Sequence, residues 1–193
     1  MNDFLARTQE GAAALRRAVS DISAQPQLLA SVREEPAVGA GILAGVIAQV
    51  DKARTLTRPS ALGVAALMVN HAAYAWSLYR RGARNDALGW GLRAAAWGAG
   101  VAATRTQPTT AAVAVGGAAV LVTSALAGDP ALRTDAGKGM SHGANLLVAA
   151  EGLTALRAAL KQRKRRARLV RAAEAGALVI GHLLLIDGLH RTR

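Results

Sequence analysis

The sequence predicts an all-α protein, a multi-pass transmembrane bundle of five to six Ala/Gly-rich helices preceded by a short N-terminal amphipathic helix. Six apolar segments follow one another in residues 37–193, and each is bounded by charged residues or proline. The chain is 52% hydrophobic but holds only one Phe, two Tyr and three Trp, so its helices must pack through small residues, which suits close helix packing in lipid. A mean hydropathy of +0.22 leaves room for a polar part outside the bilayer, and residues 1–36 form such a region.

The N-terminal region is expected to contain one helix over residues 3–24. Its apolar positions Leu15, Val19 and Ile22 recur at helical spacing among charged residues, which is typical of an amphipathic helix. Such a helix lies on a membrane surface, packs on a partner or stays solvated. The region has no continuous apolar stretch of the kind found in a cleavable signal peptide, so we expect insertion to use the internal segments.

The six apolar segments differ in length. They cover residues 37–50, 60–79, 87–103, 109–128, 139–160 and 171–188. A helix needs about 20 residues to cross a bilayer core of about 30 Å. The second, fourth and fifth segments reach that length, and the third and sixth approach it. The first has only 14 residues, so we expect a re-entrant, interfacial or partner-packed helix there.

Basic residues predict the topology, because cytoplasmic loops are enriched in Lys and Arg. If segment 37–50 does not cross, 16 basic residues lie on one side and 7 on the other, whereas six crossings give almost no bias. The sequence therefore favours five crossings of the cell (inner) membrane with a cytoplasmic N-terminus. The basic run from Arg157 to Arg171 would anchor this topology, with binding of anionic lipid as an alternative role. Tyr74, Trp76, Tyr79 and Trp90 are expected in an interfacial aromatic belt.

The net charge of +12 does not by itself indicate a nucleic-acid partner. The basic residues lie between apolar segments, and no aromatic platform is interleaved with them, so loops that flank membrane spans explain them more simply. The absence of cysteine excludes disulfides, thiolate nucleophiles and cysteine-ligated metals. No catalytic motif is present, so we expect no metal site and a protein that is not an enzyme by itself.

Polar residues within the apolar segments form the candidate site, because ionisable groups in a bilayer usually face a partner, a cavity or a ligand. The predicted buried polar residues are Asn70, Arg93, His142, Asn145, Glu151 and Glu174. Arg93 and Glu151 lie on parallel segments at depths that two long side chains can nearly span, which predicts a structural ion pair. An intramembrane enzyme that acts on lipid through Glu151, His142 and Asp187 is a further alternative.

His71 and His182 form the candidate cofactor contact. Their segments run parallel, and each histidine lies about eleven residues from the start of its segment, so the imidazoles should sit at similar depth. Two such imidazoles would hydrogen-bond a quinone head group or ligate a haem b. The alternative is that each histidine bonds a polar neighbour on an adjacent helix.

An internal repeat is indicated by a shift of 78 residues, which aligns Pro36–Asp51 with Ala114–Asp129 without gaps. Chance matches are common in an alanine-rich chain. A true repeat would give two units of three helices and would favour six crossings.

Four short motifs carry a family resemblance. They are Arg58-Pro59 at the start of a span, Trp97-Gly98-Ala99-Gly100, Leu126-Ala127-Gly128-Asp129-Pro130, and His142-Gly143-Ala144-Asn145-Leu146-Leu147. With these motifs, residues 56–160 resemble the DoxX family of small four-helix membrane proteins. Members of that family are associated with quinone-linked redox or oxidative-stress complexes, so the resemblance implies an accessory membrane subunit. It carries over no catalytic residue.

The expected function is therefore that of a small integral membrane accessory or anchoring subunit, in a quinone-linked redox complex or another membrane-associated complex. It would contact the bilayer and either a partner protein or further copies of itself. A small transporter or channel is an alternative, because of the polar residues within the spans. A peripheral helical scaffold that forms an oligomer is another, because of the low mean hydropathy.

Overall fold

The chain is helical throughout the part that its structure describes. A computed structural model describes residues 2–24, 34–55, 60–84, 87–108, 110–159 and 164–192, and no strand occurs in these ranges. The helices are α1 (Asn2–Ala24), α3 (Pro36–Thr55), α4 (Ala61–Arg80), α5 (Ala87–Thr104), α6 (Thr110–Ala127), α7 (Met140–Ala159) and α8 (Lys164–Arg191), with a short turn of 3-10 helix, η1 (Pro130–Leu132), between α6 and α7. The predicted helical fold class is confirmed.

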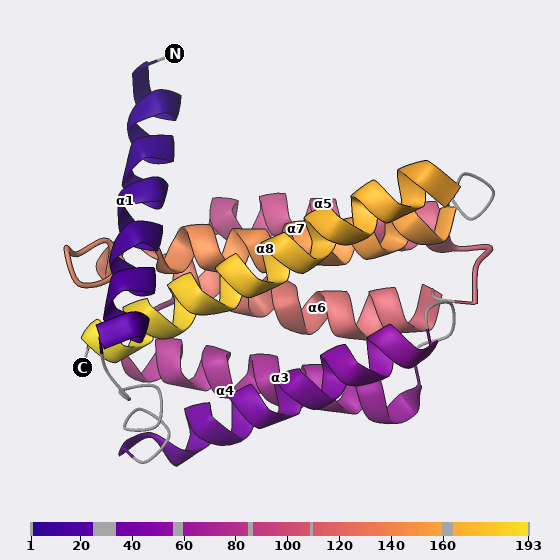
Figure 1. The fold of residues 1–193 in the computed structure, drawn as a ribbon, viewed down its shortest axis with the longest axis horizontal. Coiled ribbons are helices and arrows are strands. Elements are labelled where there is room, and N and C mark those ends of the chain that lie inside the picture. The colour runs from indigo at the N-terminus through magenta and orange to yellow at the C-terminus, as the bar shows by residue number, and fades with distance from the viewer. Residues whose placement is uncertain are drawn as a thin grey trace.

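Helices α3 to α8 lie side by side, and successive helices run in opposite directions (Figure 1). α3 pairs with α4, both α4 and α7 pack on α6, α5 also packs on α6, and α8 lies along α7. α1 stands across one end of this bundle, where Ala14 and Ala18 pack against Leu184 of α8 (Figure 1). We call this end the α1 end; it holds the start of α3 and the last turns of α4 and α8.

One apolar core joins the helices, and glycines let them approach closely. Tyr74, Leu78, Leu147 and Leu185 are fully or almost fully buried in it. A Cβ atom on Gly143 of α7 would lie 2.6 Å from a backbone carbonyl oxygen of α8. No side chain fits in that space, so small residues set the spacing of these helices, as the composition predicted.

Caps fix the length of α4. Ser60 accepts a hydrogen bond from the Gly63 N–H at 3.0 Å and donates to Asp51 of α3 at 2.7 Å. At the other end Gly82 has a φ of +90°, and its N–H and that of the next residue bond carbonyls of the last turn, which is a Schellman motif. These contacts place α4 in register with α3.

Two predicted helices differ from the structure. α3 has 20 residues, six more than the apolar segment 37–50, because the charged residues at its end have partners on neighbouring elements. α1 packs on α8 of the same chain, where Ala14 and Ala18 add small residues beside the predicted apolar stripe and allow close contact. Of that stripe, Leu15 packs against this contact, and the side chains of Val19 and Ile22 lie outside the described part. Residues 160–163 of the predicted basic run, and the side chains of residues 157–167, also lie outside it.

Among the described residues, three helices are long and apolar enough to cross a membrane: α4, α6, and residues Arg168–Arg191 of α8. α7, which the sequence counted as a full-length span, is not among them because its polar side chains lower its hydropathy. The α8 segment, by contrast, is longer than predicted. The 78-residue shift makes α7 the counterpart of α4 and α8 the counterpart of α5. The packing does not repeat in this way, because α8 lies along α7 whereas α5 packs mainly on α6.

Candidate functional site

Tyr74 lies between the two histidines that the sequence singled out. Its hydroxyl is 3.1 Å from Nδ1 of His182 on α8. Its ring centroid is 5.9 Å from that of His71 and 5.8 Å from that of His182. Helical spacing therefore did bring the two imidazoles to one region of the bundle, but they meet through a tyrosine that was expected in the interfacial belt.

This arrangement does not fit a haem held by both histidines. Such a haem needs its iron between the two imidazoles, and the fully buried side chain of Tyr74 occupies that space. Each imidazole instead contacts a neighbouring helix through Nδ1, with Thr123 as the partner of His71 at 3.0 Å and Tyr74 as the partner of His182 at 3.1 Å. The two histidines act as links between helices, which is the alternative that the sequence left open.

His71 also lines a lateral groove between α4 and α6. This groove has a volume of about 550 Å³ and is lined by Met68, His71, Ala72, Ala75, Trp76, Tyr79, Ala119, Val122 and Leu126. The Thr123 hydroxyl lies 3.0 Å from His71 Nδ1, 3.2 Å from the His71 carbonyl oxygen and 3.3 Å from the Ala119 carbonyl oxygen. The contact with Nδ1 joins α4 to α6, and either tautomer of His71 satisfies it, because a hydroxyl can donate to Nδ1 or accept from it.

Asn70 fits α4 against α3. Its Nδ2 donates to the Gly41 carbonyl at 2.8 Å, and a Cβ on Gly45 would come within 2.9 Å of the same nitrogen. Asn70 is fully buried, as predicted. Its amide therefore works with two glycines to set the distance and register of α3.

Glu151 and Glu174 meet around Lys52 near the end of α3, and we call these three residues the lysine cluster. The ammonium Nζ lies 2.9 Å from Oε1 of Glu151 and 3.2 Å from Oε1 of Glu174. Thr154 also donates to Glu174 Oε1, at 2.8 Å. The ion pair of Glu151 thus forms with a residue that the sequence placed in a loop. The three residues join α3, α7 and α8.

The other predicted polar residues lie at helix contacts. Arg93 of α5 donates to Ser124 of α6 at 3.0 Å, and Ser124 donates to Asn145 of α7 at 2.7 Å. Asn145 is exposed although its side-chain oxygen accepts this bond from α6, so the prediction that it is buried is wrong. His142 is half-buried and faces Gly11 of α1, where a Cβ would lie 3.1 Å from the imidazole.

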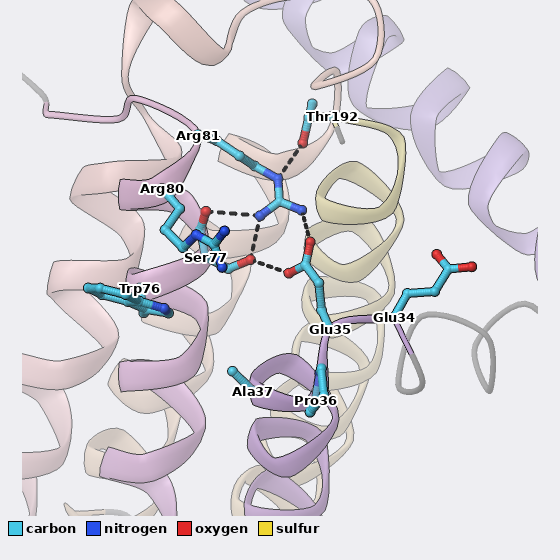
Figure 2. Close-up of a pocket in the computed structure, with 9 residues that line it drawn as sticks. All are labelled: Glu34, Glu35, Pro36, Ala37, Trp76, Ser77, Arg80, Arg81 and Thr192. Atoms are coloured by element: carbon cyan, nitrogen blue, oxygen red, sulfur yellow. Dashed lines mark hydrogen bonds and ion pairs between the residues drawn. The ribbon is translucent and has the colours of Figure 1, made fainter.

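Arg81, which the sequence analysis did not single out, ties three helix ends together at the α1 end of the bundle (Figure 2). Its guanidinium donates to Glu35 before α3, to the carbonyl and hydroxyl of Ser77, to the Leu189 carbonyl at 2.8 Å, and to Thr192 at 3.1 Å. These contacts use all five of its N–H donors. Arg81 is therefore committed to structure.

Arg81 also controls the charge of Glu35. Partial burial acts to raise the pKa of Glu35, but hydrogen bonds from Arg81 and Ser77 and the charges of Arg81 and Arg80 outweigh it. The net effect holds the pKa of that carboxyl below its ordinary value, so Glu35 is ionised at neutral pH and the ion pair is fully charged.

These residues form the wall of a cavity of about 620 Å³, which we call the end pocket. It is lined by Glu34, Glu35, Pro36, Ala37, Trp76, Ser77, Arg80, Arg81 and Thr192 (Figure 2). Its lining holds two carboxylates and two guanidinium groups, so its formal charges balance, and the Glu34 carboxylate points away from Arg81 (Figure 2). In the sequence, the only signal for it is a pair of adjacent acids before one helix and a pair of arginines after another.

Aromatic side chains lie beside the end pocket. The rings of Trp76 and Tyr79 stack with centroids 6.3 Å apart, and the Arg84 guanidinium lies 3.8 Å from the centre of the Tyr79 ring. Both aromatic residues are exposed. A stacked Trp, Tyr and Arg at the end of an apolar helix is typical of a membrane interface. The predicted aromatic belt thus keeps these two residues and loses Tyr74 to the core.

Within the described ranges, no group of three or more His, Cys, Asp or Glu side chains could hold a metal ion. No family model, no curated protein and no solved structure matches the chain. The resemblance to the DoxX family therefore stays a prediction, and a function must be argued from the geometry of this chain.

Proposed function

We propose that this chain is a bilayer-embedded helical anchor, an accessory subunit that holds a partner at the membrane. The observation that carries this proposal is the apolar exterior, because large apolar side chains are exposed on every helix from α3 to α8. They are Leu43, Val46, Ile47, Val50, Leu62, Met68, Val69, Trp76, Tyr79, Leu88, Leu92, Trp97, Val115, Leu156, Leu169 and Val179. Soluble monomers rarely expose apolar surface on this scale, whereas lipid would cover it.

The interior supports a fixed scaffold. Asn70 joins α4 to α3, His71 joins it to α6, and Tyr74 joins it to α8. Polar contacts of this kind stabilise helix association in lipid. With these contacts holding its helices together, the bundle offers its outer faces and its ends for recognition.

The path of α3 decides between five and six crossings. α3 lies along α4 for its full length and carries four of the exposed apolar residues on its outer side, which supports six crossings over the five predicted from charge. Because the chain has no cysteine, Glu34→Cys and Arg54→Cys each report alone in a labelling experiment. Labelling from opposite sides of the membrane would support six crossings, and labelling from the same side would support five.

Membrane extraction tests the proposal itself. An integral bundle stays in the membrane after carbonate treatment, whereas a peripheral oligomeric scaffold leaves it. Purification from native membranes in mild detergent should then yield a partner protein. A stable monomer without partner, lipid or quinone would contradict the anchoring role.

A quinone-linked complex would use the lateral groove. His71 Nε2 would donate to the carbonyl of a quinone in one tautomer and accept from the hydroxyl of a quinol in the other, and the Thr123 contact at Nδ1 fits both. Quinol in the purified protein that His71→Leu removes would support this role. If His71→Leu retains as much quinol as the unmodified protein, the quinol does not bind at His71 in the groove.

A small transporter is the second candidate, and one observation favours it. Glu151 belongs to the lysine cluster and also lines a small apolar cavity of about 110 Å³ between α5, α6 and α7, beside Trp97. A carboxylate in such a position is a candidate cation or proton site. Reconstituted vesicles test the idea, because Glu151→Gln should abolish flux; unchanged flux would remove it.

A further inference from the structure

The two ends of the bundle differ in charge. The end opposite α1 holds the last turns of α3, α5 and α7 and the first turns of α4, α6 and α8, and we call it the basic end (Figure 1). The segments that include the helix connections of this end contain 12 Lys and Arg against 3 Asp and Glu; they are residues 51–59, 105–109 and 151–174. The rest of the chain contains 12 Lys and Arg against 9 Asp and Glu. Most of the net charge of +12 therefore belongs to the basic end.

The three acidic residues of the basic end are used inside the bundle, and none of them is exposed. The Asp51 carboxylate accepts hydrogen bonds from the Ser60 hydroxyl at 2.7 Å and from the Ser60 N–H at 3.1 Å, where it supports the cap of α4. Glu151 and Glu174 bind the ammonium of Lys52 at 2.9 and 3.2 Å. These carboxylates therefore do not neutralise the surface of this end.

Four arginines of the basic end are exposed, and none of them forms an ion pair within the part of the chain that the structure describes. They are Arg54, Arg105, Arg168 and Arg171. At the α1 end, by contrast, ion pairs engage basic residues, namely Arg81 with Glu35, Lys138 with Asp135, and Arg191 with Asp187. The basic end thus presents cations that the chain itself does not neutralise, and an anionic ligand would suit it.

The exposed arginines lie at the depth of lipid headgroups. Arg168 is the first residue of the α8 segment that is able to cross a membrane. Arg54 lies in the last turn of α3, and Arg105 directly follows the end of α5. Arg171 lies about 4.5 Å farther along α8 than Arg168, a distance over which its long side chain can reach back to the interface. In a bilayer, each guanidinium would therefore be within reach of lipid phosphates.

We infer that the basic end binds anionic phospholipids such as phosphatidylglycerol, through charged hydrogen bonds from its arginines to the phosphates. A guanidinium suits a phosphate because it offers parallel N–H donors. A zwitterionic lipid also carries an ammonium, which these arginines repel, so charge selects the anionic lipid. An acidic protein segment would suit the same charges, but lipid phosphates surround all of these positions in a bilayer. The inference rests on the proposed function, since it needs an embedded bundle, and goes beyond it, because an anchor need not select its lipid.

Lipid competition tests the inference on the unmodified full-length protein. The protein is incubated in mixed micelles with equal amounts of phosphatidylglycerol and phosphatidylcholine, and the lipid that copurifies is measured by mass spectrometry. We expect phosphatidylglycerol to be retained most. Its advantage should shrink between about 0.1 M and about 1 M salt, because the screening length falls from about 10 Å to about 3 Å. Equal retention, or a preference that salt does not change, would overturn the inference. If carbonate still fails to extract such a protein, the embedded anchor stands without lipid selection.

Matched variants locate the binding surface. One variant replaces all four exposed arginines of the basic end: Arg54→Gln, Arg105→Gln, Arg168→Gln and Arg171→Gln. It should lower the preference for phosphatidylglycerol about tenfold or more, because each basic residue near an anionic membrane surface contributes about fivefold. The control removes four exposed arginines at the α1 end and should keep the preference: Arg16→Gln, Arg17→Gln, Arg80→Gln and Arg133→Gln. An equal loss in both variants would show that total charge, and not the basic end, selects the lipid.

Two further measurements separate other anionic ligands from lipid. Soluble glycerol phosphate, at the same concentration as phosphatidylglycerol, should not displace the lipid, because a surface of several arginines holds several lipids of one micelle together. Displacement would assign the arginines to a free phosphate ester. The second measurement follows a protein that copurifies from native membranes. If the basic-end variant loses that protein while the unmodified chain shows no preference for phosphatidylglycerol, the basic end binds an acidic protein and the lipid assignment is wrong.

Discussion

The hydroxyl of Tyr74 lies 3.1 Å from Nδ1 of His182, and this contact joins α4 to α8 across 108 positions of the sequence. Tyr74 is fully buried and its ring also packs edge-on against His71. One phenol thus links both histidines to the core, and its hydroxyl supplies a directional contact in a bundle built mainly from small apolar residues.

Removing that hydroxyl should loosen α8. Tyr74→Phe keeps the ring packing but leaves His182 Nδ1 without this partner, and we expect a loss of about 1 kcal/mol of unfolding free energy, the size of an interhelical hydrogen bond in membrane proteins. Unfolding in mixed detergent micelles measures it. Tyr79→Phe alters an exposed tyrosine of the same helix and should leave stability unchanged. Equal stability of both variants would show that the contact contributes nothing.

Arg81 should resist even conservative replacement. Its planar fork reaches Glu35, Ser77, Leu189 and Thr192 together, and a lysine ammonium has only three donors on one atom. We expect Arg81→Lys to destabilise the bundle by about 2 kcal/mol, the scale of leaving buried acceptors without donors. Arg84→Lys, at an exposed position, is the control. If Arg81→Lys is as stable as the unmodified protein, the positive charge at position 81 is sufficient and the fork of donors contributes nothing.

Acid should weaken the same end of the bundle. The pKa of Glu35 is held below its ordinary value of 4.5, so its contribution to stability is present above that pH and is lost as pH falls through the lower folded-state value. Thermal unfolding between about pH 6 and pH 3 should show a fall in stability that is smaller in Glu35→Gln. Parallel pH profiles for the two proteins would exclude Glu35 as its source.

The lysine cluster should respond unequally to loss of its members. Lys52→Gln leaves two carboxylates close together without their shared cation, whereas Glu151→Gln leaves the pair of Lys52 and Glu174 intact. Breaking a buried ion pair by removing one partner costs about 3–5 kcal/mol, and the partial exposure of this cluster lowers that figure. We expect Lys52→Gln to be the more destabilising in denaturant unfolding. Lys138→Gln, which removes an exposed pair with Asp135, should have almost no effect.

The sequence predicted how far along its helix a residue lies better than it predicted which residues of other helices surround it. Counting from segment starts placed His71 and His182 together, because the rise per residue is constant in a helix. Asn145 was predicted to be buried because it interrupts an apolar segment, and it is instead exposed while it bonds Ser124 of α6, since a contact between helices does not require burial. Lys52 and Arg81 were missed because both follow the last apolar residue of a segment. Charges at helix ends look like loop residues until the elements that pack beside them are known.

The crossing of α7 and α8 offers the sharpest test of the small-residue packing that the composition predicted. A Cβ on Gly143 would lie 2.6 Å from the Gly181 carbonyl oxygen and 2.8 Å from the Leu185 nitrogen, and backbone atoms cannot turn aside. Gly143→Ala should therefore push the helices apart and destabilise the bundle by about 1–3 kcal/mol, as overpacking does. Gly152 lies on the same helix with no atom within 4 Å of its added Cβ, so Gly152→Ala should be neutral or should stabilise α7 by about 0.5–1 kcal/mol. Unfolding of the two variants in one detergent compares them directly, and a Gly143→Ala protein as stable as Gly152→Ala would mean that α7 and α8 do not cross as closely as this structure places them.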